Sequence, residues 1–410
     1  MLKRMSLVRV ICMVFGVLLW ASGATASPVT INCFGTLPPA LVEQFNKQNL
    51  DVKLVAELPQ ELTETAYQNA VRSGKYDLVL SMASPGYMDQ WVQDGLFLSL
   101  NAYIKRDGIN IKSFVGNLAE AMRLDNNLYD LPLRLMPYHV VYNRDLFDSK
   151  GVDCPRPGWT WDDFREMATR LTGKTPDSHG AVVPVDVWAV MAEQHANRIY
   201  EATLEEYASI LAFTKSMVSD KSLSIDLPEE VNGGFVMVTN MGFETGKIAM
   251  QVTRYPPRIG DFPIGIAPLP APKGQQSTTP VTVLSMGIPK AARHAAEAWR
   301  VIRFLTTPQA SQLLADSGWL PAVNLNPHVL GLWATARIGR IPAGLESLAG
   351  INLSVAGRRF EQINTDFWYF LEGQANGFFR GRQSEDSVLQ AIREEGRSAN
   401  SRARAILSSK

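Results

Sequence analysis

The chain has 410 residues, and its 40 basic and 40 acidic side chains give a formal net charge of zero. This balance excludes a generally basic protein of the kind that binds nucleic acid or anionic membranes through its overall charge. Hydrophobic residues make up 46% of the chain, and the length exceeds what one hydrophobic core usually supports, so we expect two packed lobes.

The first 26 residues have the pattern of a secretory signal peptide. Three basic residues precede an apolar run over residues 10–20, and residues 24–26 form a small-x-small cleavage pattern. We predict cleavage after Ala26 and export to the periplasm, with a net charge of about −3 remaining. No later segment has the roughly 18 to 20 apolar residues of a transmembrane helix, and no cysteine lies in a lipoprotein-type pattern, so we expect no anchor.

Two cysteines follow the predicted cleavage site, Cys33 and Cys154. A disulfide between them is one interpretation, because the periplasm is oxidising. We favour two free thiols, because such a bridge would tie one lobe to the other.

Strand-like and helix-like segments alternate along the chain. We expect strands at residues 29–34, 51–57, 76–80, 182–187, 235–239, 246–252 and 281–288, and helices after Pro38 and Thr160 and at residues 61–73, 88–95, 188–200, 203–218, 291–306, 308–316, 327–348 and 360–407. Thr160 with Asp163 has the spacing of a capping box. The early alternation of strand and helix predicts parallel sheets with helices on both faces.

Residues 131–143 form an apolar, extended run that Pro137 interrupts. Proline cannot donate to a sheet ladder, so it ends one strand and lets another begin. We interpret this stretch as a crossing between two lobes, and the alternative is a bend within one sheet. Residues 264–270 have the same character and are expected to form the return crossing, with a third crossing at residues 317–321.

The common sequence signatures of catalysis are missing. There is no G-x-S-x-G elbow, no P-loop and no G-x-G-x-x-G, and the five histidines are scattered without metal-ligand spacing, so we predict no metal and no cofactor. The acidic pairs 162–163 and 229–230 are explained by capping and solvation. Four arginines near the end of the chain recur at helical spacing together with Glu394 and Glu395, which is typical of a solvated helix face: Arg393, Arg397, Arg402 and Arg404.

Several segments, in order across nearly the whole chain, resemble one family. They are SGKYDLVLS (73–81) with WVQDGLFLSL (91–100), LYDLPLRLMPYHVVYNRDLF (128–147) with GWTWDDF (158–164), GKIAMQ (246–251), FPIGIAPLPAPKG (262–274) with GIPKAARHAAEAWRVIRFL (287–305) and SGWLPA (317–322), and FWYFLEGQANGFFRGRQS (367–384). The chain is similar to the extracellular solute-binding proteins of family 1, the periplasmic receptors of ABC importers for sugars and related solutes. Maltodextrin- and glycerol-phosphate-binding proteins belong to this family.

The resemblance implies an α/β, two-lobed periplasmic-binding-protein fold. Each lobe would be a mainly parallel sheet flanked by helices, and three hinge crossovers would join the lobes. Lobe one would hold residues 27–136 and 266–320, and lobe two residues 137–265 and 321–410. A solute would bind in the cleft between them, and hinge closure would enclose it.

The resemblance also implies which residues face the solute. They are Phe34, Thr36, Ser81, Ser84, Tyr138, Asp186, Trp188, Arg254, Tyr255, Trp319 and Trp368. Flat aromatic rings suit the apolar faces of a sugar, and carboxylate or guanidinium groups suit its hydroxyls.

Three of these residues have a rival interpretation. Trp368 and Trp188 are equally compatible with core packing, and Asp186 with capping of the helix that follows it. Arg254 stands where the family often has a Gly and a Trp, which leaves the solute open. Together with Arg134, it keeps an anionic sugar or a phosphate ester as an alternative to a neutral sugar.

The preferred interpretation is a monomeric receptor that is not an enzyme and delivers a carbohydrate-like solute to an ABC permease. One alternative is a secreted carbohydrate-active enzyme of the glycoside hydrolase type, because glycosidase carboxylates have no short signature. A second is a sensor that presents its ligand without transport.

Overall fold

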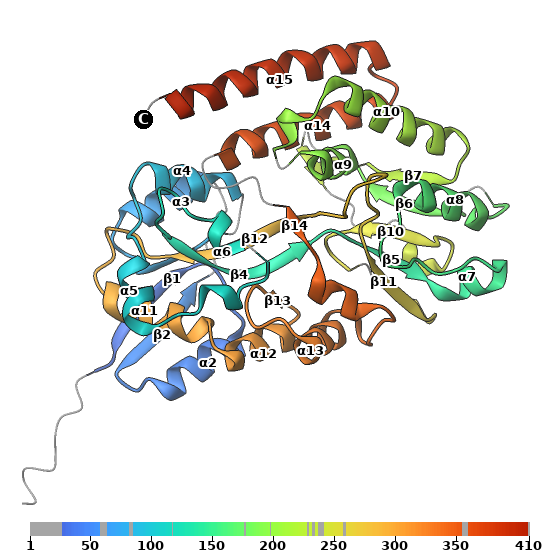
Figure 1. Cartoon of the computed structure of the whole chain (residues 1–410). Coiled ribbons are helices and arrows are strands. Elements are labelled where there is room, and N and C mark those ends of the chain that lie inside the picture. Colours follow the sequence, from blue (N-terminus) through green and yellow to red (C-terminus); the bar gives the residue numbers. More distant parts are fainter. Residues whose placement is uncertain are drawn as a thin grey trace, which may run out of the picture.

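Two separate β-sheets organise the chain in the computed structural model (Figure 1). The structure describes residues 27–57, 64–81, 85–116, 118–175, 178–196, 198–227, 229–231, 234–236, 242–256, 260–354 and 360–408. The predicted signal peptide, the predicted site residue Ser84 and part of the predicted strand 235–239 lie outside these residues. No helix in the described part is long and apolar enough to cross a membrane.

The first sheet is mixed. Its strands are β1 (Val29–Phe34), β2 (Val52–Glu57), β3 (Leu78–Leu80), β4 (Asp130–Pro137), β12 (Thr279–Gly287), β13 (Leu320–Pro321) and β14 (Leu353–Ser354). The order is β13-β4-β12-β3-β1-β2, and β14 pairs with β12. β1 is parallel to β2 and β3 as predicted, but β12 is antiparallel to β3 and β4. β4 leaves this sheet for the other one and β12 returns from it, so they run in opposite directions.

The second sheet has the order β11-β5-β10-β6-β7. Its strands are β5 (His139–Asn143), β6 (Ala181–Pro184), β7 (Leu223–Asp226), β10 (Met250–Thr253) and β11 (Ile264–Pro268), and β8 (Glu229–Val231) and β9 (Gly234–Val236) form a separate hairpin. β10, β6 and β7 are parallel, whereas β5 is antiparallel to β10 and β11. The predicted two-lobed α/β fold is therefore confirmed, although both sheets are mixed.

Helices flank both sheets. Those before the first crossing are α2 (Pro39–Gln48), α3 (Glu64–Arg72), α4 (Pro85–Gln93), α5 (Asn101–Asp107) and α6 (Leu118–Ala121), followed by α7 (Arg144–Lys150), α8 (Trp161–Leu171), α9 (Val187–His195), α10 (Leu204–Ser219), α11 (Ala295–Leu305), α12 (Pro308–Asp316), α13 (Pro327–Ile338), α14 (Glu361–Phe379) and α15 (Glu385–Ser408). Short 3-10 turns are η1 (Ile111–Ser113), η2 (Ile199–Glu201), η3 (Phe243–Thr245) and η4 (Leu345–Gly350). α15 runs along α14 and α10 on the outside of the second sheet's half (Figure 1).

The predicted capping box at the start of α8 is confirmed. The Asp163 backbone N–H donates to Thr160 Oγ1 at 3.2 Å, and the Thr160 backbone N–H donates to Asp163 Oδ2 at 2.7 Å. Two N–H groups that the first turn would leave unpaired are thereby satisfied.

The chain crosses from the first sheet to the second at Tyr138. β4 ends at Pro137 in one sheet, β5 begins at His139 in the other, and the Tyr138 backbone N–H donates to the Pro280 carbonyl at 3.1 Å. The predicted crossing is therefore confirmed, and the alternative of a bend within one sheet is wrong.

The two later crossings differ from the prediction. β11 still belongs to the second sheet, so the return lies between Pro268 and Thr279 rather than within residues 264–270. At the predicted third crossing, β13 pairs with β4, and α13 packs on α12. The chain therefore leaves the first sheet only after β14. Residues 321–354, expected in lobe two, lie with the first sheet because the apolar side of α13 is buried in its core: Val329, Leu330, Trp333 and Ala334.

Both described cysteines are free, as favoured by the sequence analysis. Cys33 is buried on β1, and burial raises the pKa of its thiol to about 12. Because the thiolate is the reactive form, this cysteine is an inert part of the core.

Gly180 sits where α8 meets the start of β6, and a Cβ there would lie 1.8 Å from the Ala168 carbonyl oxygen. We expect Gly180→Ala to lower the free energy of unfolding by about 1–3 kcal/mol, because backbone must shift to make room. The control is Gly373→Ala in α14, where nothing lies within 4 Å of the added Cβ. It should raise the free energy by about 0.5–1 kcal/mol through helix propensity. Denaturant unfolding measures both, and changes of the same sign would contradict this packing argument.

Candidate functional site

Three side chains from different elements meet beside the first crossing. The Tyr138 hydroxyl donates to Asp186 Oδ2 at 2.5 Å, and Trp368 Nε1 donates to the same oxygen at 3.4 Å. The Tyr138 and Trp368 rings are stacked, with centroids 6.1 Å apart. The crossing positions Tyr138, the turn after β6 positions Asp186, and α14 positions Trp368. The structure thus brings together three of the predicted site residues.

Asp186 does not cap α9. It occupies the residue before that helix, but its side chain makes no capping hydrogen bond, so the capping interpretation is wrong. The side chain is almost fully buried, and Oδ1 has no hydrogen-bond partner among the described residues. A buried polar atom normally has a partner, because leaving one unpaired costs about 1–3 kcal/mol or more for a charged group. This oxygen is therefore available to accept a hydrogen bond from a ligand.

Two further carboxyl groups belong to the site and were not predicted. Asp226 ends β7, directly opposite Pro184 of the parallel strand β6, so it lies at the same edge of the sheet as Asp186. Glu372 lies one helical turn after Trp368. Burial raises the pKa of each to about 7, and the charge of Asp186 adds to the shift in both. For Glu372, Arg254 opposes the shift.

Sequence signals for both carboxyl groups exist in hindsight. Asp226 follows a short extended run, as Asp186 does, and the carboxyl ends of neighbouring parallel strands meet at one edge. Glu372 lies four residues after Trp368, which places both side chains on one face of a helix. The first signal was missed because residues 223–226 were not predicted as a strand.

Arg254 supplies the positive charge of the site. It follows β10, and its guanidinium lies 5.5 Å from the Tyr138 ring centroid and 5.7 Å from that of Tyr255. Nη1 donates to Thr282 Oγ1 at 3.5 Å. Tyr138 and then Asp186 raise the pKa of Arg254 above its ordinary value, although burial opposes them. In the described part of the chain no acidic side chain forms an ion pair with it, so its remaining donors are free for a ligand.

Trp188, which was also predicted for the site, lies in the core instead of beside Trp368. Its ring packs against Phe378 and Phe379 of α14, and Nε1 donates to Thr214 Oγ1 at 3.0 Å. These contacts occupy the ring, and only 2% of its surface is exposed. Its position two residues after Asp186 in the sequence could not reveal this, because residues two apart in a helix point in nearly opposite directions.

The predicted residues of the first sheet's half are largely buried. Phe34 packs edge-on against Tyr67 and Tyr76, and Ser81 forms hydrogen bonds with Ser285. Thr36 is partly buried in the bend after β1. The structure does not bring these three to the Asp186 cluster, and their contact with a solute stays a prediction.

Trp319 contacts a different arginine. The Arg134 guanidinium lies 4.9 Å from its ring centroid. Arg134 also lines a small cavity at the crossing together with Arg254, Tyr255, His139 and Arg337. Through this cavity the Trp319–Arg134 pair adjoins the Arg254 side of the site.

Comparison with known proteins shows the family of the chain. Residues 29–312, well over half of the chain, match the family described as bacterial extracellular solute-binding protein. The chain belongs to this family.

Similar proteins of known name and structure fit the same family. A protein of Brucella abortus (strain 2308), named as a binding protein, is 24% identical over 264 residues, which cover 59% of this chain. The chain spans 62% of the length of that relative and of its counterpart in Brucella suis biovar 1. These curated relatives are therefore matched over less than two thirds of their length.

Solved structures show the fold of this solute-binding protein over nearly its whole length. A sugar transporter of Rhizobium etli in an open conformation has a TM-score of 0.72 and 18% identity, covering 90% of this chain and 99% of that one. The sugar-binding protein MalE of Xanthomonas citri has a TM-score of 0.69 and 18% identity, covering 93% and 100%. UgpB of Mycobacterium tuberculosis, solved with glycerophosphocholine, has a TM-score of 0.68 and 15% identity, covering 94% and 99%.

The raised pKa of Glu372 predicts a pH dependence of stability. Its value of about 7 in the folded chain is above the ordinary 4.5, so the folded state binds more protons between these values. Stability contributed by this group therefore falls as pH rises from about 4.5 to 7 and is constant above. We expect Glu372→Gln to flatten this part of the curve.

The measurement is urea unfolding of both proteins between pH 4.5 and 8. Other shifted groups, such as His139 with its pKa lowered to about 4 by burial, contribute equally to both curves and cancel in the difference. A difference that does not change with pH would contradict the assignment.

Proposed function

We propose that this protein is a periplasmic receptor that captures a carbohydrate-like solute between its lobes and delivers it to an ABC permease. The observation that carries the proposal is the free Oδ1 of buried Asp186, held beside the stacked rings of Tyr138 and Trp368. A sugar offers apolar C–H faces that suit aromatic rings and hydroxyls that suit a carboxylate. Family membership supports capture and delivery without bond chemistry.

The names of the structural neighbours support a sugar as the solute class. They include MalE of Xanthomonas citri and proteins solved with cycloalternan and mannotriose. Export by the segment 1–26, a monomeric state and the absence of a lipid anchor belong to the same proposal. Export is supported by the sequence pattern of residues 1–26 and by the extracellular description of the family.

The charge of the site favours a neutral solute. Two carboxyl groups, Asp186 and Glu372, lie near the Arg254 guanidinium, and a third, Asp226, lies near Asp186. Asp186, together with the partly ionised Glu372 and Asp226, offsets the positive charge of Arg254, so the site has no excess of positive charge to hold an anionic solute. A neutral polyhydroxyl solute can instead donate to the carboxylates and accept from Arg254.

A second candidate function rests on the same carboxyl groups. Glycosidases use one carboxyl with a raised pKa as an acid and a second as nucleophile or base. Glu372, with its pKa of about 7, and Asp186 have these properties. The family match favours the receptor over this enzyme of the glycoside hydrolase type.

The test is calorimetric titration of neutral mono- and oligosaccharides, polyols, sugar acids and glycerol phosphodiesters into protein that has been unfolded and refolded to remove bound solute. We expect a neutral sugar to bind. Trp368→Ala should weaken binding by tenfold or more, equivalent to about 1.4 kcal/mol, because a stacking face is lost. Tyr369→Ala is the matched control, because Tyr369 is the next residue of α14 and is 57% exposed. It should leave the affinity unchanged.

Two outcomes would overturn the proposal. Binding that Trp368→Ala and Tyr369→Ala weaken equally would separate the solute from the Asp186 cluster. Turnover of a chromogenic glycoside that Glu372→Gln abolishes would favour the enzyme instead.

A further inference from the structure

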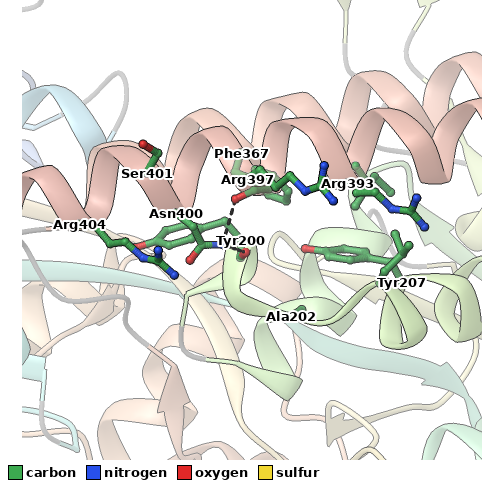
Figure 2. A pocket seen from close by; sticks show the side chains of 12 residues that line it. Tyr200, Ala202, Tyr207, Phe367, Arg393, Arg397, Asn400, Ser401 and Arg404 are labelled. Atoms are coloured by element: carbon green, nitrogen blue, oxygen red, sulfur yellow. Dashed lines mark hydrogen bonds between the residues drawn. The ribbon is translucent and has the colours of Figure 1, made fainter.

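A second hollow lies far from Asp186, on the outer side of α14. It is a groove of about 580 Å³ between α15 on one side and η2 with the start of α10 on the other (Figure 2). Phe367 lines it, whereas the neighbouring Trp368 contacts Asp186. Consecutive residues of a helix point about 100° apart, so α14 separates this groove from the proposed solute site.

Three arginines of α15 line the groove. Arg393, Arg397 and Arg404 are exposed, and none has a hydrogen-bond or ion-pair partner among the residues that the structure describes. Figure 2 shows Arg397 between Arg393 and Arg404 along the side of α15 that faces Tyr200 and Tyr207. The sequence analysis expected Arg402 on the same solvated face as these three arginines. Arg402 does not line the groove, however, and donates to Glu395 at 2.9 Å.

The acidic side chains near the groove are engaged elsewhere. Glu394 accepts from Gln390, and Glu395 accepts from Arg402, both on α15. On the opposite wall, Glu201 pairs with Arg198 at 2.6 Å, and Glu206 closes the capping box of α10. The positive charge of the groove is therefore not neutralised by these groups, and an anion entering it would be attracted.

Tyr200 gives an independent sign of a ligand. It lines the groove with 2% of its surface exposed, and no described residue meets its hydroxyl with hydrogen-bond geometry. The nearby Arg198, whose guanidinium lies 6.0 Å from the ring centroid, is paired with Glu201. Figure 2 shows this hydroxyl directed toward Arg404. The backbone beside it is fixed, since Asn400 Nδ2 donates to the Tyr200 carbonyl at 3.1 Å. A buried hydroxyl without a partner in a cationic groove is suited to an anionic oxygen.

The spacing of the arginines indicates the shape of the ligand. Arg393 and Arg397 are one helical turn apart, about 6 Å, whereas Arg404 lies about 10 Å beyond Arg397 along the axis. Between Arg397 and Arg404, α15 contributes the polar residues Asn400 and Ser401, whereas apolar and aromatic side chains from other elements also line the groove: Tyr207, Phe367 and Leu204. We propose that the groove is a second binding site, for a ligand with two phosphate or carboxylate groups joined by a partly apolar connector. A soluble metabolite can carry two such groups, and an anionic lipid surface presents them on neighbouring headgroups.

The test uses hexane bisphosphate as the soluble probe in calorimetric titrations with the full exported protein. We expect binding that weakens with salt, and hexyl phosphate should bind at least tenfold more weakly because it engages one end only. The double variant Arg397→Ala/Arg404→Ala should weaken bisphosphate binding by tenfold or more. The matched control is Arg402→Ala, which removes the same charge from the same helix outside the groove and should change affinity less than twofold. Tyr200→Phe should weaken bisphosphate binding severalfold.

A parallel arm sediments the protein with phosphatidylglycerol–phosphatidylcholine vesicles and with pure phosphatidylcholine vesicles. Retention on the anionic vesicles alone, lost in the double variant and kept in Arg402→Ala, would assign the site to a lipid headgroup. Bisphosphate binding without retention would assign it to a soluble ligand. The proposal would be overturned if neither bisphosphate binding nor vesicle retention is observed. It would also be overturned if Arg402→Ala and the double variant reduce binding equally. Circular dichroism verifies that each exposed-residue variant is folded.

Discussion

The hydrogen bond between the Tyr138 hydroxyl and Asp186 is the contact on which the arrangement of the site depends. Tyr138 is the residue at which the chain passes from one sheet to the other, and Asp186 follows a central strand of the second sheet. The bond therefore ties the crossing to the edge of the sheet. Trp368 reaches the same carboxylate from α14, so a helix near the end of the chain is oriented by residues far before it.

Burial makes this small cluster electrostatically strong. A carboxylate removed from water is costly unless hydrogen bonds or opposite charge stabilise it. Tyr138, Trp368 and the nearby Arg254 supply that stabilisation for Asp186. Asp226 and Glu372 receive less of this stabilisation, so burial raises the pKa of each to about 7. Hydroxyl groups of a bound solute would supply the hydrogen bonds that these carboxyl groups lack, and this gain would favour binding.

The last two helices give the second half two different surfaces. α14 presents Trp368 and Glu372 toward Asp186 and Phe367 toward the opposite side. α15 covers that side, Asn400 holds it to the Tyr200 backbone of η2, and a line of arginines borders the groove beside this contact. One helix thus separates an acidic site, near the crossing, from a basic groove on the outside.

Elements that local chemistry controls could be predicted from the sequence. The capping box of Thr160 and Asp163, the helix beginning at Pro308 and the break at Pro137 follow from side chains within a few residues, so they were predictable. The family segments also determined the two-lobed fold. The direction of β12, the late third crossing after β14, and the positions of Trp368 beside Asp186 and of Trp188 in the core were not predictable, because each depends on packing between residues distant in the chain. The same reason hid Asp226 and Glu372, whose role arises when strand and helix bring them to Asp186.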